Sequence, residues 1–167
     1  EFYILILMSA LGCGVIVASS HFVSFFLGLE LLSVSLYVLV AYLRTEPIHI
    51  EAGIKYLIPA AVSVAFLLMG GAFIYAYCGT MNFLAIARGS SIFINNSPLL
   101  IAGMVMVVVG IGFKLAIVPF HLWTPDVYEG APAPVTGFIA TASKGAVFAL
   151  LLRYFTVINI YECRPMF

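Results

Sequence analysis

The chain has 167 residues, of which 64% are hydrophobic and only 8% are charged, and its formal net charge is zero. Soluble domains carry about a quarter charged residues, so this composition indicates an integral membrane protein in a lipid bilayer. A neutral chain offers no basic surface, which excludes nucleic acid as a partner. The chain begins with Glu1 and is apolar from its second residue, so we expect it to be part of a longer protein.

Five apolar segments are long enough to cross a bilayer, which takes roughly 20 helical residues. The expected helices cover residues 2–19, 22–43, 51–78, 98–122 and 135–160. Between them we expect a polar loop over 44–51, a short interfacial helix over 81–88 and an irregular linker over 124–134. The sequence therefore predicts an all-α polytopic membrane protein with about five transmembrane helices.

The fourth of these segments is predicted to be a broken helix. Pro119 has no N–H and so leaves the carbonyl of Leu115 without its helical partner, directly beside Lys114. In hydrocarbon a free carbonyl must find water or a polar neighbour. A lysine near the centre of a membrane helix costs about 2.5–3.5 kcal/mol on insertion scales, which makes it a functional residue by default. The pattern predicts a helix break with a hydrated amine.

Two further charges lie well inside apolar segments. Glu30 interrupts the second segment and shares a helical face with Ser33 and Tyr37, so we expect this face to look into a bundle. Lys144 lies in the fifth segment. Glu30, Lys114 and Lys144 thus lie on three different helices. Burial of each charge in a membrane costs free energy, so we expect these residues to have a function.

Electrostatics suggests what these charges do. Burial disfavours the charged form of a lysine, and a nearby carboxylate favours it again. A change in the separation of Glu30 and Lys114, or the approach of Lys144, would therefore release or reload the proton of Lys114. We interpret the three residues as a proton relay. The structural alternative is that they form buried pairs that fix helix register.

Other polar residues allow two interpretations each. Lys55 either extends to the membrane surface or acts beside a carboxylate. His121 suits a proton carrier if the helix break leaves it on the face of Lys114, and it is otherwise an interfacial histidine. We interpret Trp123 as an interfacial anchor. Asp126 and Glu129 are expected to be solvated or structurally paired.

The sequence contains no pattern for nucleophilic catalysis, phosphate binding, metal coordination or dinucleotide binding. Cys13, Cys78 and Cys163 are far apart and lack metal-ligand spacing. We therefore expect no cofactor in this chain, and any redox chemistry belongs to another subunit.

The motifs around these residues resemble the antiporter-like subunit N, the equivalent of mitochondrial subunit 2, of proton-pumping NADH:quinone oxidoreductase (respiratory complex I). The resemblance covers nearly the whole chain in order. Its motifs are residues 28–33 (GLELLS), 51–56 (EAGIKY), 112–135 (GFKLAIVPFHLWTPDVYEGAPAPV) and 140–144 (ATASK).

The resemblance implies that Glu30 and Lys114 are the glutamate–lysine pair of a first half-channel. It implies that Lys144 is the connecting lysine on the next helix and that Lys55 is an additional lysine of this subunit. It also implies an antiporter-like fold of two inverted five-helix repeats, of which this chain supplies the first. Pro59, close to Lys55, departs from the pattern of this family.

The expected function is proton translocation through a buried Glu/Lys relay, coupled to quinone reduction elsewhere in the complex. The resemblance implies that NADH, FMN, iron–sulfur clusters and quinone are bound by partner subunits. The partners are other membrane subunits of complex I, and a bacterial inner membrane is favoured over the mitochondrial inner membrane. The alternatives are a subunit of an Mrp-type Na⁺/H⁺ antiporter and a structural membrane subunit that conducts no ions.

Overall fold

The computed structural model describes residues 1–43, 46–86 and 97–157, and these residues are helical with short connections. The helices are α1 (Phe2–Ala18), α2 (Phe22–Val40), α3 (Pro47–Cys78), α5 (Pro98–Leu115), α6 (Thr124–Gly130), α7 (Ala133–Phe138), the π-helix η1 (Ile139–Ser143) and α8 (Lys144–Val157). Residues 83–86 are also helical, residues 81–82 lie before that helix, and residues 87–88 of the helix predicted over 81–88 lie outside the described residues. The all-α prediction is confirmed.

Four helical stretches in the described part of the chain are long and apolar enough to cross a membrane. They are Phe22–Val40, Pro47–Cys78, Pro98–Leu115 and the continuous stretch Ala133–Arg153. α1 is also apolar but has 17 residues, just below the length of the others. The structure thus has four clear candidate spans and a shorter fifth helix, where the sequence predicts about five.

Several helix ends differ from the prediction. α2 ends at Val40 rather than 43, and α3 begins at Pro47 rather than 51. Proline suits the first turn of a helix because the N–H it lacks has no helical partner there. The linker predicted over 124–134 is wrong, since it contains the two turns of α6. Pro125 lies at the start of α6 and Asp126 in its first turn, where a negative charge is favourable.

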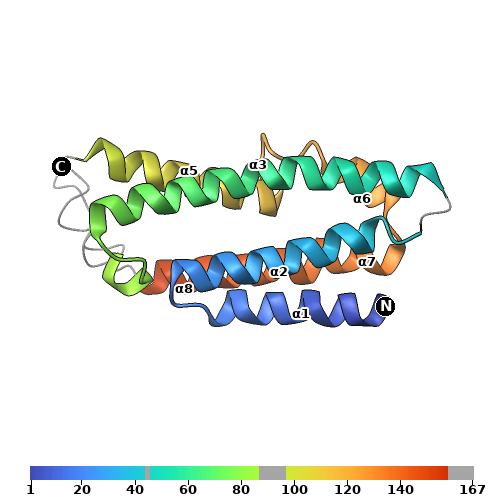
Figure 1. Ribbon diagram of the computed structural model, residues 1–167, viewed down its shortest axis with the longest axis horizontal. Coiled ribbons are helices and arrows are strands. Elements are labelled where there is room, and N and C mark those ends of the chain that lie inside the picture. Colours follow the sequence, from blue (N-terminus) through green and yellow to red (C-terminus); the bar gives the residue numbers. More distant parts are fainter. Residues whose placement is uncertain (44–45, 87–96, 158–167) are drawn as a thin grey trace.

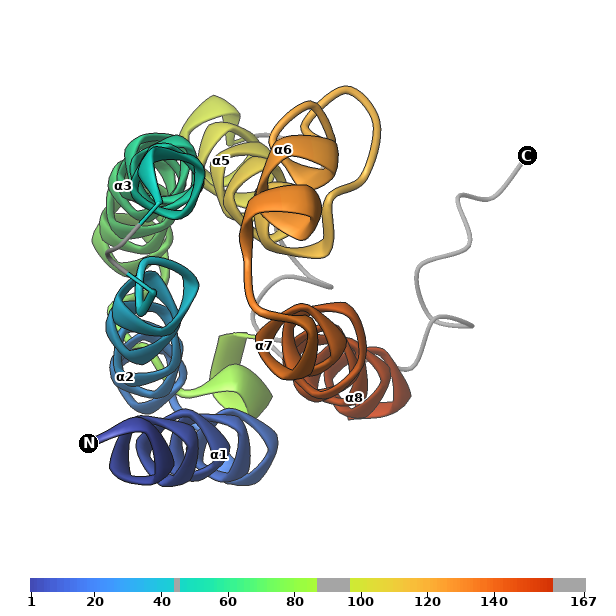
Figure 2. The same cartoon turned by 90° about the vertical axis from the view of Figure 1, so that its right-hand side faces the viewer.

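The helices form an elongated bundle in which α3 runs along most of the length (Figure 1). α6 packs along the N-terminal part of α3, and α5 packs along the remaining part of α3. α1 packs along α2, and α8 lies against α1 (Figure 2). α3 remains a continuous helix across Pro59, although that proline leaves the carbonyl of Lys55 without its helical donor.

Backbone contact between α3 and α5 depends on two glycines. A Cβ atom on Gly70 would lie 2.7 Å from the carbonyl oxygen of Gly103. In the same way, a Cβ atom on Gly103 would lie 3.0 Å from the carbonyl oxygen of Gly70. Small residues of this kind allow membrane helices to pack at short range. The close approach fixes α5 against α3 and with it the position at which α5 ends.

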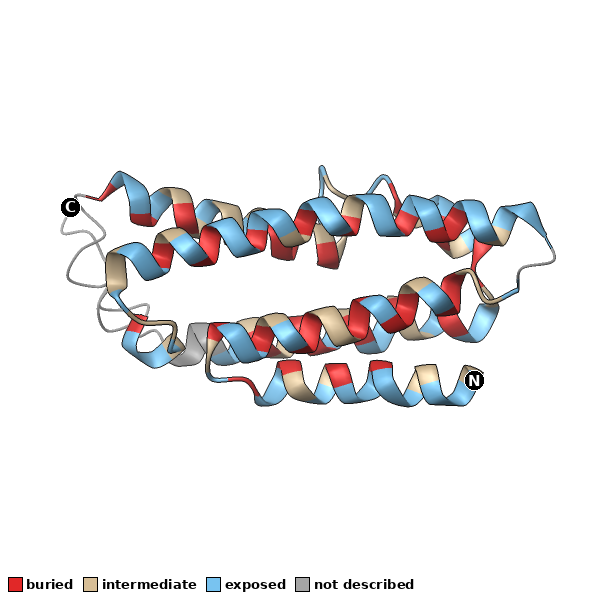
Figure 3. Ribbon diagram, in the orientation of Figure 1, coloured by how far each residue is buried: buried red, intermediate tan, exposed pale blue. Residues whose placement is uncertain are grey.

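Each helix buries one face toward its neighbours and leaves the opposite face exposed (Figure 3). The exposed face is itself apolar: Leu7 and Val108 are each 68% exposed and Leu27 is 60% exposed. An apolar surface of this extent is not stable in water and must be covered by lipid or by other protein. The burial pattern thus agrees with the membrane assignment.

Candidate functional site

The predicted break in the fourth apolar segment is confirmed, and α5 ends near the middle of the bundle (Figure 1). The last helical residue is Leu115, and Ala116 adopts the left-handed conformation with φ 57°. The N–H of Ile117 then donates to the carbonyl of Gly112 at 2.9 Å, which closes the helix end. The break lies four residues before Pro119, at the carbonyl that this proline leaves free.

The break places Lys114 in the last turn of α5, where the partial negative charge of a helix C-terminus favours a cation. Lys114 is only 7% exposed. Its Nζ donates to Ser33 Oγ of α2 at 2.8 Å and to Tyr56 OH of α3 at 3.2 Å. The same Nζ lies 5.4 Å from the centroid of the Tyr56 ring. Two helices, α2 and α3, thus hold the amine of α5 through neutral hydroxyl groups.

Glu30 lies near this amine without touching it. Glu30 lies one helical turn before Ser33, which contacts Lys114, but in the described part of the chain Glu30 and Lys114 form no direct ion pair. Glu30 is half-buried, and its Oε1 is buried with no hydrogen-bond partner among residues 1–43, 46–86 and 97–157. The two residues predicted as a pair therefore do not form a direct ion pair within the described residues, and their coupling stays a prediction.

Lys144 lies against a different aromatic ring from Lys114. Lys144 is the first residue of α8, directly after the π-helix η1, and its Nζ lies 5.6 Å from the centroid of the Tyr128 ring on α6. The Tyr128 hydroxyl is buried and has no hydrogen-bond partner within the described residues. No direct hydrogen bond joins Lys144 to Lys114 within those ranges, so any exchange between them needs an intermediate carrier.

The interfacial interpretation of Trp123 is wrong. Trp123 is 6% exposed, and its ring centroid lies 5.0 Å from that of Tyr56. After the helix break the chain passes through the turns of residues 116–123 and enters α6, whose start lies against α3. Local sequence does not reveal this turn, because an aromatic residue beside a polar linker is also typical of a membrane interface.

Sequence reasoning missed Tyr56 as a partner of Lys114. The sequence around Tyr56 does indicate a buried helical face. Ala52 lies four residues before Tyr56, Ala60 four residues after it and Ser63 seven residues after it. This spacing places them on one face of α3, and all four are buried. A face of small residues around one tyrosine indicates a helix contact with that hydroxyl inside it.

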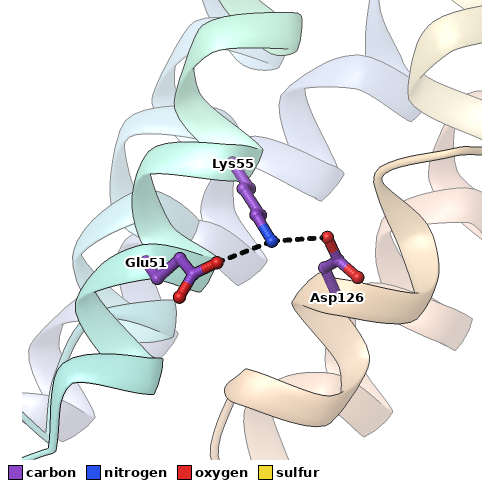
Figure 4. A network of polar contacts seen from close by, with 3 residues as sticks. All are labelled: Glu51, Lys55 and Asp126. Atoms are coloured by element: carbon purple, nitrogen blue, oxygen red, sulfur yellow. Dashed lines mark ion pairs between the residues drawn. The ribbon is translucent and has the colours of Figure 1, made fainter.

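Lys55 lies beside carboxylates, which agrees with one of its two interpretations. Its Nζ is 2.7 Å from Glu51 Oε1 on α3 and 2.8 Å from Asp126 Oδ2 on α6 (Figure 4). A second contact joins the same helices, since the His49 ring nitrogen Nδ1 hydrogen-bonds the carbonyl of Gly130. His49, which the sequence places in a loop, lies in the first turn of α3. These contacts hold α6, and with it Trp123, against α3.

We expect the Asp126→Asn variant to be nearly as stable as wild type. The side chains of Lys55 and Asp126 are 45% and 50% exposed, and half-exposed ion pairs contribute little because solvent screens them. Thermal unfolding of the variant should shift by less than about 4 °C. The exposed residue Glu129 on the same helix provides the control Glu129→Gln. A much larger shift in Asp126→Asn alone would contradict this expectation.

His121 does not share a helical face with Lys114. It lies in the turns between α5 and α6 and is exposed, because the helix does not continue past the break. The proton-carrier interpretation of His121 required the face of Lys114 to continue past the break, and it does not. Elsewhere in the described ranges, no three His, Cys, Asp or Glu side chains come together in a way that could hold a metal ion.

Comparison with known proteins identifies the family of this chain. The family model described as NADH:quinone oxidoreductase/Mrp antiporter, TM, matches residues 19–165. NADH-quinone oxidoreductase subunit N of Nitrosospira multiformis is 56% identical over 153 residues, which are 89% of this chain and 29% of that protein. The chain thus spans about a third or less of the proteins it matches.

Solved structures give the same fold. A chain of respiratory complex I from Thermus thermophilus with bound aureothin has a TM-score of 0.80 and 39% identity, over 91% of this chain and 33% of that one. A chain of an archaeal membrane-bound sulfane sulfur reductase has a TM-score of 0.77 and 28% identity, over 86% of this chain and 30% of that one. The Mrp complex of Dietzia sp. DQ12-45-1b matches in fold alone, with a TM-score of 0.81 at 22% identity over 96% of this chain and 30% of that one. The chain belongs to the NADH:quinone oxidoreductase/Mrp antiporter family of membrane proteins, as a homologue of NADH-quinone oxidoreductase subunit N.

Proposed function

We propose that this chain is part of a proton-translocating membrane subunit of NADH:quinone oxidoreductase, in which Lys114 is the central proton carrier. One observation carries the proposal: an amine that is 7% exposed is held by two neutral hydroxyl groups. A buried lysine whose only task was to fix helix register would need a direct carboxylate partner to offset its desolvation.

The two hydroxyl groups suit both protonation states of the lysine. Hydroxyl oxygens accept hydrogen bonds from an ammonium, and hydroxyl hydrogens donate to a neutral amine. Ser33 and Tyr56 can therefore satisfy Lys114 before and after it loses a proton. An arginine or a tightly paired lysine would not have this freedom.

Glu30 and Lys144 set the proton affinity of this carrier from a distance. The negative charge of Glu30 favours the ammonium form of Lys114, and a positive charge on Lys144 disfavours it. A conformational step that changes either separation would load or unload the carrier. Lys55 contributes by holding α6 in place through Asp126. His121 is exposed beyond the break and has no part in this proposal.

The redox chemistry belongs to partner subunits. NADH, FMN, the iron–sulfur clusters and quinone would bind in those subunits, and proton movement here would be coupled to quinone reduction there. The other membrane subunits of the complex would cover part of the exposed apolar surface. The similarity to the Nitrosospira multiformis protein supports this assignment and a bacterial inner membrane.

Exchanging Glu30 for Gln in the assembled complex tests the proposal. We expect proton translocation per NADH to fall several-fold, because the variant removes the charge that favours a protonated Lys114. Glu46→Gln is the matched control, since Glu46 is exposed at the start of α3. Translocation can be followed in proteoliposomes with a pH-sensitive dye, together with the rate of quinone reduction. Equal translocation in the two variants would count against the proposed role of Glu30.

A second function, Na⁺/H⁺ antiport, is favoured by the breadth of the family model, whose description includes Mrp antiporters. The same lysine could serve such an exchange. We expect translocation driven by NADH oxidation to proceed at an unchanged rate when sodium is removed from both sides of the membrane. A strict requirement for sodium would favour the antiporter function instead.

A further inference from the structure

A small cavity lies directly beside Lys114. Its volume is about 10 Å³, and its walls include Ser33, Tyr56, Ser63, Lys114 and Trp123. A single water molecule needs about 10–15 Å³ by this measure, so the cavity is at the lower limit of the size that holds one water and has no room for anything larger. A cavity with purely apolar walls would stay dry, but these walls carry five polar side chains.

The walls offer hydrogen-bond donors that are not fully used. The Trp123 indole Nε1 is buried and donates to no acceptor in the described part of the chain. A lysine ammonium has three hydrogens, and Lys114 uses two of them, toward Ser33 Oγ and Tyr56 OH. The cavity therefore has two donors to offer to an occupant.

The walls also offer acceptors. Ser33 Oγ donates its hydrogen to the Leu29 carbonyl at 2.6 Å, and Ser63 Oγ donates to the Gly110 carbonyl at 2.8 Å. A hydroxyl oxygen that donates still has lone pairs with which to accept. Two donors and two acceptors around one cavity match the hydrogen bonds that a buried water typically makes.

We propose that this cavity is a binding site for one water molecule, which accepts hydrogen bonds from the Trp123 indole and from Lys114 and donates to the two serine hydroxyls. The indole N–H occupies one lone pair of the water permanently. The other lone pair serves the ammonium form of Lys114, and the water turns a hydrogen toward the amine when the lysine is neutral. Trp123 is therefore a positioning residue that orients the nearest proton neighbour of Lys114.

The role of this water in proton transfer rests on the proposed function, whereas the site itself does not. The test is the structure of the assembled complex in lipid, at a resolution that shows ordered water, for wild type and for Trp123→Phe. Phenylalanine keeps an aromatic ring against Tyr56 and removes the N–H. We expect a water peak within hydrogen-bond distance of Trp123 Nε1 and Lys114 Nζ in wild type and its loss in the variant.

A matched control is Thr124→Val, because Thr124 also has a buried hydroxyl without a partner in the described residues but does not line this cavity. We expect this variant to keep the water. We expect proton translocation per NADH to fall up to about tenfold in Trp123→Phe, as for the loss of one hydrogen bond between neutral groups, and to stay near wild type in Thr124→Val.

The absence of the water from wild type would overturn the site, whether or not the variant folds. If the water is present in wild type and lost in Trp123→Phe while translocation is unchanged, the positioning role is overturned. If the water is present but replacement of Lys114 leaves translocation intact, the site is supported and the proposed function fails. The two proposals are thus tested separately.

Discussion

Replacing Lys114 by arginine is expected to lower proton translocation per NADH by about a hundredfold or more, which is the contribution that a positioned proton carrier typically makes. Arginine keeps the positive charge but does not release a proton near neutral pH. The Lys114→Met variant removes the charge and should be impaired to a similar degree. Both would be measured in proteoliposomes that contain the assembled complex, with the rate of quinone reduction recorded in parallel.

The arginine variant separates a proton carrier from a residue that fixes helix register. If Lys114 only fixed register, arginine would preserve function and methionine would impair assembly, because a cation alone would satisfy the site. The control is Arg153→Lys, which exchanges the same two residue types at an exposed position in α8. Normal translocation in Lys114→Arg would contradict the carrier role.

Removing one hydroxyl group next to Lys114 should also have a large effect. We expect the Tyr56→Phe variant to translocate protons about ten- to a hundredfold more slowly, because a hydrogen bond to a charged group contributes about 1.5–3 kcal/mol. The hydroxyl lies 3.2 Å from Lys114 Nζ. The ring should stay in place, since it packs against Trp123 and Tyr37 with centroids 5.0 and 5.3 Å apart.

The matched control for this variant is Tyr75→Phe, which removes a hydroxyl from a tyrosine that is 51% exposed on the same helix. It should translocate protons at the wild-type rate. Initial rates of dye quenching, divided by the rate of quinone reduction, give the comparison. If Tyr56→Phe and Tyr75→Phe behave alike, the hydroxyl of Tyr56 has no part in handling the proton.

Local chemistry in the sequence predicts the helices and the site of the break. Hydrophobic runs of sufficient length set the spans. α5 ends at Leu115, the residue whose carbonyl Pro119 leaves free, whereas the same missing N–H at Pro59 leaves α3 continuous. The burial of Lys114 follows from the same segment, since its neighbours on both sides are apolar. These features depend on residues close together in the chain and can be predicted without knowledge of the fold.

The path of the chain after the break could not be predicted in this way. α6 begins at Thr124 and packs on α3. This contact buries Trp123 against Tyr56, which is far away in the sequence. The Lys55–Asp126 ion pair that holds α6 joins equally distant positions. Such contacts depend on how helices pack, for which a single sequence provides no spacing rule.

The relation between Glu30 and Lys114 also depends on packing. Helical periodicity places Ser33 on the same face as Glu30, and this face does look toward Lys114. Periodicity does not indicate which residue of that face reaches the amine. In the structure Ser33 makes the contact, and Glu30 forms no direct ion pair with Lys114 within the described residues.

The central claim is that the carboxylate of Glu30 sets the proton affinity of Lys114, and the pH profile of proton translocation tests it most directly. Without that carboxylate the lysine holds its proton only at lower pH, so the alkaline limb in Glu30→Gln should move toward lower pH. The Glu46→Gln profile should match wild type. An unshifted alkaline limb in Glu30→Gln would contradict the claim.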